Sequence, residues 1–340
     1  MRANSLQILI VCVCLLVVLQ PHAARAVLLA YDDFNYSNVG GDLNTNGGGG
    51  SFGFSDSWSG QTSYNIANGS LVSPRDPLPR VGNSVSAVAF GENRGIDRNF
   101  PSSLGAENSS LYMSVLMQPI GILHQGAYDG WFGVALRGAN GNAFVSIGMN
   151  YSQSNYGVRL ADLYAQSNVA AVVGKTVFLV LRVDYTEGVD PLRLYVNPQP
   201  GAPEPTTANA SLIDYDVQFF TQLSLTGPGG SAFDSVRIGT TFLDVAPPVA
   251  DFNTSGKVDG ADLDLWEANY GSMTASHSLG DTNDDLDVDG SDFLVWQRQL
   301  GAMDTVPAVN AIPEPEAWML GIGGALVASS QRRRASPFAH

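Results

Sequence analysis

The chain has 340 residues, of which 44% are hydrophobic and 14% are charged, and its formal net charge at pH 7 is −15. Acidic residues outnumber basic ones by 32 to 17, a balance that repels phosphate backbones and excludes nucleic acid as a partner. The hydrophobic fraction is too high for a disordered chain, so we expect a folded core.

The N-terminal segment, residues 1–26, has the composition of a secretory signal peptide. Arg2 precedes an apolar run at 9–19, and the small-residue site Ala24-Arg25-Ala26 follows it. A transmembrane helix needs about 20 apolar residues, so this run is too short to span a bilayer. We therefore expect export and cleavage after Ala26. Both cysteines of the chain lie in this segment, so we expect neither disulfides nor thiol catalysis in the mature protein.

Residues 27–245 are rich in Gly, Asn and Ser and contain short segments of strand character. The segment 111–117 places large apolar residues at every second position, which is the period of a half-buried strand. Similar segments with turn residues between them are 131–136, 143–149, 156–163, 176–183, 192–196 and 235–240. Many short strands with turns between them predict a mainly β fold, an antiparallel jelly-roll sandwich.

Three segments of this region, 31–34, 194–198 and 233–241, resemble the concanavalin-like or laminin-G-like jelly rolls of bacterial surface proteins. The resemblance covers residues 27–245 and implies a fold more than an activity. By analogy with such folds, exposed aromatic side chains on a concave sheet bind glycans, which makes polysaccharide the candidate ligand. The aromatic side chains available for this are Trp58, Tyr64, Tyr128, Trp131, Tyr151, Tyr156 and Tyr164.

No pattern in the chain indicates catalysis, and we predict no catalytic residue. The sandwich region has one histidine, His124, and its only glutamates are Glu92, Glu107, Glu187 and Glu204. Glycoside hydrolysis needs two carboxylates about 5–9 Å apart. The nearest candidates, Asp184 with Glu187 and Asp214 with Asp216, stand in turn-like sequence. We favour a non-enzymatic protein; the open alternatives are a carbohydrate-active enzyme (a polysaccharide hydrolase or lyase) and a structural spacer.

The composition changes at Asp251, after the Pro-containing boundary 246–248. Residues 251–301 hold 11 acidic and 2 basic side chains, and the segment 251–262 recurs as the segment 281–292. Calcium takes six to eight oxygen ligands, and a 12-residue loop can supply them from positions 1, 3, 5, 7, 9 and 12. The predicted ligands of loop one are Asp251, Asn253, Ser255, the Lys257 carbonyl, Asp259 and Asp262. Those of loop two are Asp281, Asn283, Asp285, the Asp287 carbonyl, Asp289 and Asp292.

Each loop is followed by apolar residues at helical spacing, which predicts two helices that pack through their aromatic faces. The two sets are Leu263, Trp266 and Tyr270, then Phe293, Trp296 and Leu300. Position 8 is Val in both loops, which suits a short strand that links the paired loops. Position 6 needs positive φ and is Gly256 in loop one but Leu286 in loop two. We therefore expect loop one to bind calcium more tightly than loop two. Because calcium would neutralise an acidic cluster that otherwise repels itself, we also expect the module to be poorly folded without the metal.

This tandem resembles a type I dockerin, the calcium-dependent module whose partner is a cohesin domain. The shared features are Asp at position 1, Asn at position 3, Val-Asp at positions 8 and 9, and Asp in place of Glu at position 12. An acidic linker has no reason to repeat at a regular spacing with matched Trp266 and Trp296. The resemblance covers residues 246–303 and implies a cohesin-like or other docking partner.

Residues 304–340 combine three features in order: a Pro-Glu-Pro sequence at 313–315, an apolar stretch at 317–328 and the arginines 332–334. They resemble the PEP-CTERM sorting signal, which implies an exosortase-type processing enzyme and a short membrane segment, 317–330. We therefore expect an exported protein of the cell envelope, cell surface or extracellular matrix, with a calcium-dependent docking module and a polysaccharide-binding or matrix-binding jelly roll.

Overall fold

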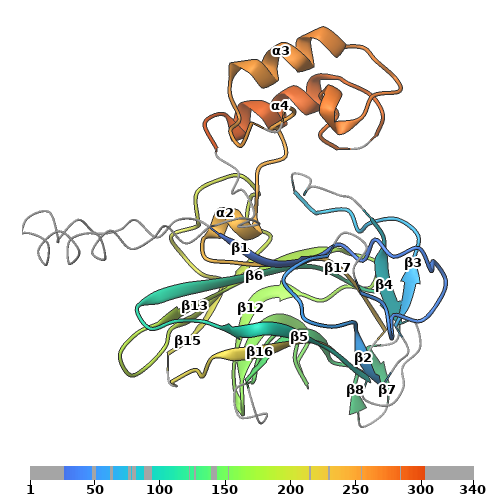
Figure 1. Cartoon of the computed structure of the whole chain (residues 1–340). Coiled ribbons are helices and arrows are strands. Elements are labelled where there is room, and N and C mark those ends of the chain that lie inside the picture. Colours follow the sequence, from blue (N-terminus) through green and yellow to red (C-terminus); the bar gives the residue numbers. More distant parts are fainter. Residues whose placement is uncertain are drawn as a thin grey trace, which may run out of the picture. The chain divides into compact units, whose positions relative to one another are not determined.

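The computed structural model describes residues 27–302, except 48–50, 62–63, 76–77, 79–81, 88–93, 122, 126–127, 139–143, 152, 214–215, 229, 254 and 284. The predicted signal peptide, 1–26, and sorting tail, 304–340 with its membrane segment 317–330, lie outside these residues. Two antiparallel β-sheets form a sandwich, and a small helical module follows it in the sequence (Figure 1). The prediction of a mainly β antiparallel sandwich is confirmed.

The first sheet has the strand order β15-β14-β13-β6-β17-β4-β3, and β1 also pairs with β17. Its central strands β6 and β13 pair in register from Ser109 opposite Tyr185 to Met117 opposite Val177. The strands are β1 (Leu28–Asp32), β3 (Asn65–Ala67), β4 (Ser84–Ala87), β6 (Ser109–Pro119), β13 (Val177–Tyr185), β14 (Leu192–Val196), β15 (Ala210–Leu212) and β17 (Ser231–Gly239).

The second sheet has the order β12-β11-β10-β9-β16-β5-β2, and a separate short hairpin pairs β7 (His124–Gln125) with β8 (Tyr128–Asp129). Neighbouring strands of this sheet are antiparallel throughout. The strands are β2 (Ser59–Gln61), β5 (Arg94–Leu104), β9 (Phe132–Gly138), β10 (Phe144–Met149), β11 (Asn155–Leu160), β12 (Leu163–Ala170) and β16 (Phe220–Gly227).

The main hydrophobic core lies between the sheets, because alternate residues of each strand point inward. On β6 the inward residues run from Leu111 to Met117, and on β13 from Val177 to Val183, all at odd positions. Each aliphatic side chain buried in this way contributes about 1.5–3 kcal/mol. The even positions of the same strands face away from this core and form the outer face of the first sheet.

That outer face of the first sheet is partly covered by a short helix, α2 (Phe242–Val245), whose capping box joins Thr241 and Asp244. Phe242 and Val245 pack on a second cluster with the even-numbered residues Tyr112, Leu116 and Phe178. The rest of this outer face carries charged side chains and is described below.

The helical module contains α3 (Gly260–Asn269), a 3-10 turn η2 (His277–Leu279) and α4 (Gly290–Gln299). Its own core includes Val258, Val295 and Trp296, with Trp266 and Phe293 packed against it. Helix packing through the two aromatic faces is thus present, with the Trp266 and Phe293 ring centroids 5.0 Å apart. Within the described part of the chain, no helix is long and apolar enough to cross a membrane.

The final residue of each predicted apolar set was assigned wrongly to the core. Tyr270 and Leu300 directly follow α3 and α4 as C-cap residues and are 63% and 55% exposed. At these positions the backbone leaves the helix, with ψ of 129° and 123°, so the helical spacing no longer predicts the direction of the side chain.

Most predicted strand segments are strands, but one was wrong, and strands outside the predicted segments were missed. The segment 156–163 is interrupted by a tight turn, where Ala161 has φ of +50°, and belongs to both β11 and β12. The longest of the missed strands are β5 and β16. In β5 the inward series is Ile96, Arg98 and Phe100, so a buried arginine hides the apolar alternation.

Candidate functional site

Loop one is closed by the carboxylates of its first and last predicted ligands. Asp251 is 7% exposed, and its two oxygens accept hydrogen bonds from the backbone N–H groups of Ser255 (2.9 Å) and Gly256 (2.7 Å). Asp262 is fully buried, and it accepts from the N–H groups of Asn253 (3.2 Å) and Asp259 (2.8 Å). The two carboxylates therefore hold the loop in a closed turn around positions 1 to 12.

Loop two has a similar arrangement, except that position 2, rather than position 3, donates to the carboxylate at position 12. Asp281 Oδ2 accepts from the Leu286 N–H at 3.0 Å, and Asp292, which is fully buried, accepts from the N–H groups of Thr282 (2.9 Å) and Asp289 (2.8 Å). Asn283 at position 3 accepts from the Asp285 N–H at 3.0 Å, as Asn253 accepts from the Ser255 N–H at 2.9 Å. The sequence repeat is therefore also a repeat of geometry.

Position 6 has left-handed backbone in both loops. Gly256 has φ of +84°, and Leu286 has φ of +75° although it has a side chain. Non-glycine residues adopt this region at a cost, because Cβ crowds the backbone. Leu286 therefore takes the turn that the loop pattern requires, and the prediction of a strained turn in loop two is supported by its backbone.

Each loop leads directly into its helix. Asp259 is the N-cap of α3 and accepts from the Ala261 N–H at 3.0 Å, and Asp289 is the N-cap of α4 and accepts from the Ser291 N–H at 2.7 Å. Hydrogen bonds from the Ser291 hydroxyl and backbone lower the pKa of Asp289 below its ordinary value. Both caps are complete capping boxes, a device that stabilises helix starts by about 1 kcal/mol.

The residues of the two loops fit calcium by their chemistry. Within the described residues, no three Asp, Glu, His or Cys side chains converge closely enough to hold a metal between them. The loops, however, also offer amide, hydroxyl and carbonyl oxygens, which are the hard donors that calcium uses. Asp262 and Asp292 are fully buried and, in the described part of the chain, neither forms an ion pair with Lys or Arg. Buried carboxylates without a cation are costly, so a bound cation would stabilise both loops.

Two tryptophans connect the loops crosswise. Trp266 of α3 donates from Nε1 to the Asp289 carbonyl at 2.9 Å, and Trp296 of α4 donates to the Asp259 carbonyl at 3.0 Å. Asp259 and Asp289 are both position 9 of their loops, so each helix contacts the loop of the other unit. The matched Trp residues of the repeat thus form hydrogen bonds between the two loop–helix units as well as packing in or against the core of the module.

The position-8 valines do not form the short linking strand that we predicted. Val288 instead bonds to the chain after α3, at Gly271 and Ser272, and Val258 bonds to the chain after α4, at Gly301 and Ala302, with N–O distances of 2.8–2.9 Å. The prediction of a Val–Val linkage was wrong, because the backbone of each valine is paired with the residues that follow a helix.

Of the seven aromatic side chains proposed for glycan binding, three are core residues, two are exposed and Trp131 is half-buried; the side chain of Tyr128 lies outside the described part. Trp58, Tyr64 and Tyr156 are at most 1% exposed, whereas Tyr151 and Tyr164 are 48% and 54% exposed. The indole of Trp58 donates to Asp32 Oδ2 at 2.9 Å, beside the buried Asp32–Arg98 ion pair (2.7 Å). Nothing in the sequence distinguishes a buried Trp from an exposed one when the strand order is unknown.

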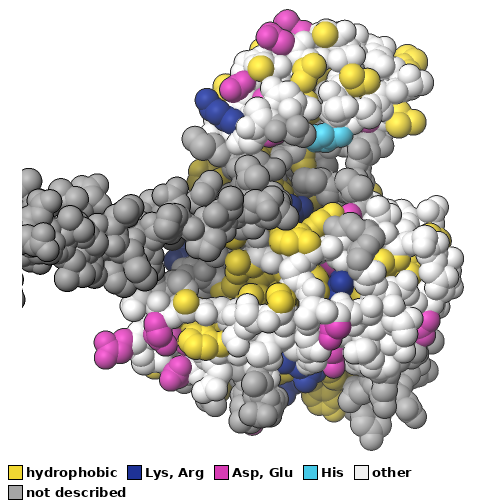
Figure 2. All heavy atoms as spheres, viewed as in Figure 1, with side chains coloured by type: hydrophobic (Ala, Val, Ile, Leu, Met, Phe, Trp, Pro, Cys, Tyr) yellow, Lys and Arg dark blue, Asp and Glu magenta, His cyan; other side chains and the backbone are white. Residues whose placement is uncertain are grey.

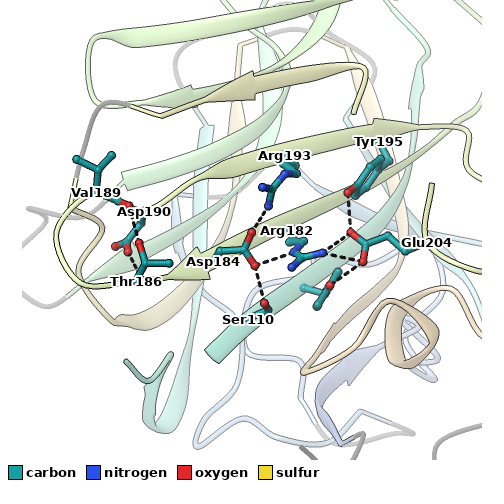
Figure 3. Close-up of polar contacts among 10 residues, drawn as sticks. Ser110, Arg182, Asp184, Thr186, Val189, Asp190, Arg193, Tyr195 and Glu204 are labelled. Carbon is teal, nitrogen blue, oxygen red and sulfur yellow. Dashed lines mark hydrogen bonds and ion pairs between the residues drawn. The ribbon is translucent and has the colours of Figure 1, made fainter. Parts of the chain in front are cut away.

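A polar network that the sequence did not reveal lies on the outer face of the first sheet (Figure 3). Arg182 of β13 donates from Nε to Asp184 at 2.7 Å and from Nη1 to both oxygens of Glu204 at 2.9 Å. Arg193 of β14 also pairs with Asp184, and Ser110 of β6 donates to it at 2.5 Å. We name the residues Ser110, Tyr112, Arg182, Asp184, Arg193, Tyr195 and Glu204 the sheet network.

The sheet network also bears on catalysis. Asp184 lies near the end of β13 and shares the guanidinium of Arg182 with Glu204, whereas Glu187 is exposed in the bend that follows the strand. Both carboxylates are ion-paired with the same guanidinium, that of Arg182, at 2.7 and 2.9 Å. The side chain of His124 and the residues 214–215 lie outside the described part, so the second candidate pair stays a prediction.

The chain was compared with protein families, curated proteins and solved structures. No protein-family model and no curated protein matches it. The T. cruzi calreticulin globular domain is 12% identical (66% of this chain, 88% of that chain, TM-score 0.37). The endo-1,3-beta-glucanase from Streptomyces sioyaensis is 9% identical (65% and 98%, TM-score 0.41), and peanut lectin 10% (64% and 98%, TM-score 0.34). Because all three TM-scores are below 0.5, the function is inferred from the chain's own residues.

Proposed function

We propose that this chain is an exported, non-enzymatic attachment protein. Its C-terminal module is organised by two calcium ions and docks onto a partner protein, and its β-sandwich binds polysaccharide at the cell surface or in the extracellular matrix. The docking mode is that of a type I dockerin, whose partner would be a cohesin-like domain. The segments 1–26 and 304–340 support export and processing by an exosortase-type enzyme.

The observation that carries the proposal is the repeated geometry of the two loops. Hydrogen bonds from position 6 to position 1 and from position 9 to position 12 recur in both copies, at 2.7–3.0 Å. The capping boxes account for one backbone hydrogen bond to each position-12 carboxylate, but burial of a carboxylate without a counter-charge is costly. A bound divalent cation gives both of them a counter-charge.

The module also has exposed apolar side chains that a docking partner can cover. Tyr270, Met273, Leu286, Leu294 and Leu300 are each at least 50% exposed. Figure 2 shows hydrophobic side chains spread over the visible surface of the module among polar ones. Interfaces typically combine apolar anchors with a polar surround, and this surface meets that description.

Calcium titration of the full chain by isothermal calorimetry tests the proposal. We expect two bound calcium ions and a rise in the melting temperature, because a ligand that binds only the folded state stabilises it. Asp262→Asn and Asp292→Asn should each remove one site. Asp264→Asn is the matched control, since Asp264 is exposed on α3 outside both loops. Binding that is absent, or equal in all four proteins, would contradict the calcium assignment.

The docking step needs a separate measurement. The full chain is passed over an immobilised cohesin domain in calcium and then in chelator, with the Asp262→Asn/Asp292→Asn double variant as control. Retention that requires both calcium and intact loops supports a dockerin-like partner. Retention that persists in chelator would show that the partner recognises another surface.

A further inference from the structure

We propose that the sheet network is the floor of a polysaccharide site on the outer face of the first sheet, and that its ligand is a neutral glycan with adjacent free hydroxyls. The inference rests on the proposed attachment of the sandwich to polysaccharide and assigns the place and the ligand class. It does not depend on the calcium module.

Two adjoining hollows meet at this network. The first, of about 610 Å³, extends over β14, β15 and the segment 204–208, and the second, of about 710 Å³, extends over the ends of β6 and β13 toward Thr240. Both are lined by Arg182, Pro191, Arg193 and Glu204. Each volume lies in the range of ordinary ligand sites, and together they form an extended site that suits a chain of sugars better than one small molecule.

The polar groups of the site are fixed in place before any ligand binds. Glu204 accepts from Tyr112 at 2.9 Å and from Tyr195 at 2.6 Å, in addition to the two bonds from Arg182. Burial, and then the neighbouring Glu204, raise the pKa of both tyrosines, which therefore remain protonated donors. Because these side chains are already ordered, a ligand loses less affinity to side-chain ordering.

The charge balance of the network selects against anionic ligands. Two arginines are matched by two carboxylates, Asp184 and Glu204, so no positive charge is left over for a phosphate, a sulfate or a uronate. The net charge of −15 on the whole chain adds a repulsion against polyanions. A neutral ligand incurs neither penalty.

The donors and acceptors match sugar hydroxyls, each of which donates one hydrogen bond and accepts others. Arg193 is 38% exposed, lines both hollows and, within the described residues, uses Nη1 on Asp184, which leaves its other N–H groups as donors for a ligand. Thr206, Thr207 and Ser211 add hydroxyls to the first hollow, and the exposed Ile213 offers an apolar contact for sugar C–H groups. Guanidinium and carboxylate groups can each bond two adjacent hydroxyls at once.

Affinity electrophoresis of the full chain tests the site. Native gels at saturating calcium contain laminarin, xyloglucan, galactomannan or dextran as neutral glycans, with alginate as the anionic comparator. We expect at least one neutral glycan to retard the protein and alginate to have no effect. Arg193→Gln should reduce the retardation at least fivefold, measured as the apparent dissociation constant. Thr206→Glu should do the same by placing a charge in the first hollow without touching the network.

The control is Arg159→Gln on β11. Arg159 is 36% exposed, against 38% for Arg193, and it also faces one aspartate, Asp162, but it lies on the other sheet. Its variant should be retarded like the wild type. A loss confined to Arg159→Gln, or equal retardation of all variants, overturns the site while leaving glycan attachment intact. No retardation by any neutral glycan, or retardation by alginate alone, overturns the ligand class, and calcium calorimetry then reports separately on the docking module.

Discussion

Leu286 shows how one residue can set the difference between two otherwise equivalent loops. It has φ of +75° where loop one has Gly256, and its side chain is 57% exposed, so it contributes little packing in return. A side chain in this region costs about 1–2 kcal/mol. Replacement by glycine relieves this backbone strain. Only part of the cost is recovered, because glycine also makes the unfolded chain more flexible and so costs entropy on folding.

We therefore predict that Leu286→Gly strengthens calcium binding in loop two by about threefold to tenfold, corresponding to about 0.7–1.4 kcal/mol. The reverse change, Gly256→Leu, should weaken loop one by a similar factor. Two-site calorimetry measures both constants. Weaker binding in the Leu286→Gly protein would show that Leu286 is held in place by contacts that a glycine cannot make.

Between elements, the crossed tryptophans predict that the two calcium loops are energetically coupled. Trp266 belongs to the first unit but donates to Asp289 of loop two at 2.9 Å. Trp266→Phe keeps an aromatic ring in the core and removes this bond, which is worth about 1 kcal/mol. We expect the affinity of loop two to fall about fivefold, although the substitution lies outside it.

Tyr270→Phe is the control for this prediction, because Tyr270 lies against Trp266 with ring centroids 5.0 Å apart but is 63% exposed. Its two calcium constants should match the wild type. If Trp266→Phe weakened only loop one, the indole would act through its own helix, and the crossed bond would not couple the loops.

For the whole sandwich, a buried carboxyl predicts how stability depends on pH. Burial, opposed by hydrogen bonds from the backbone of Leu71 and Ser235, raises the pKa of Asp234 to about 8, against 3.8 in the unfolded chain. The folded state therefore holds a proton that the unfolded state has lost between these values. Stability should fall as pH rises from about 4 to 8, by up to about 1.4 kcal/mol per pH unit.

Asp234→Asn should flatten this slope, because the amide does not titrate in this range while its oxygen remains near the two N–H groups that Asp234 binds at 2.7 and 2.6 Å. Thermal unfolding across the pH range measures it. Asp162→Asn, a change at a fully exposed carboxyl, is the control and should leave the slope unchanged. An unchanged slope in Asp234→Asn would assign the titration to other groups.

The sequence predicts the parts of this molecule that depend on local pattern. The alternation of apolar residues predicted β6, β13 and β14 correctly. The regular spacing of the repeat predicted both loops and the positive φ at Leu286. It failed where the tertiary fold decides: Arg98 points inward in β5 because Asp32 is there to pair with it at 2.7 Å. The sheet network is assembled from β6, β13, β14 and the segment around Glu204, and no single segment indicates it.

The backbone pairing of Val258 with Gly301 and Ala302 also has a mechanical meaning. Gly301 N–H donates to the Val258 carbonyl at 2.9 Å, and Val258 N–H donates to the Ala302 carbonyl at 2.9 Å. Tension that entered the chain beyond residue 302 would load these two bonds, together with the bond from the Ala302 N–H to the Gln299 carbonyl (2.8 Å), and would pull directly on loop one, in which Val258 stands at position 8. A cation in that loop would then reinforce the point where the tether meets the fold, and the force needed to open the module would depend on calcium.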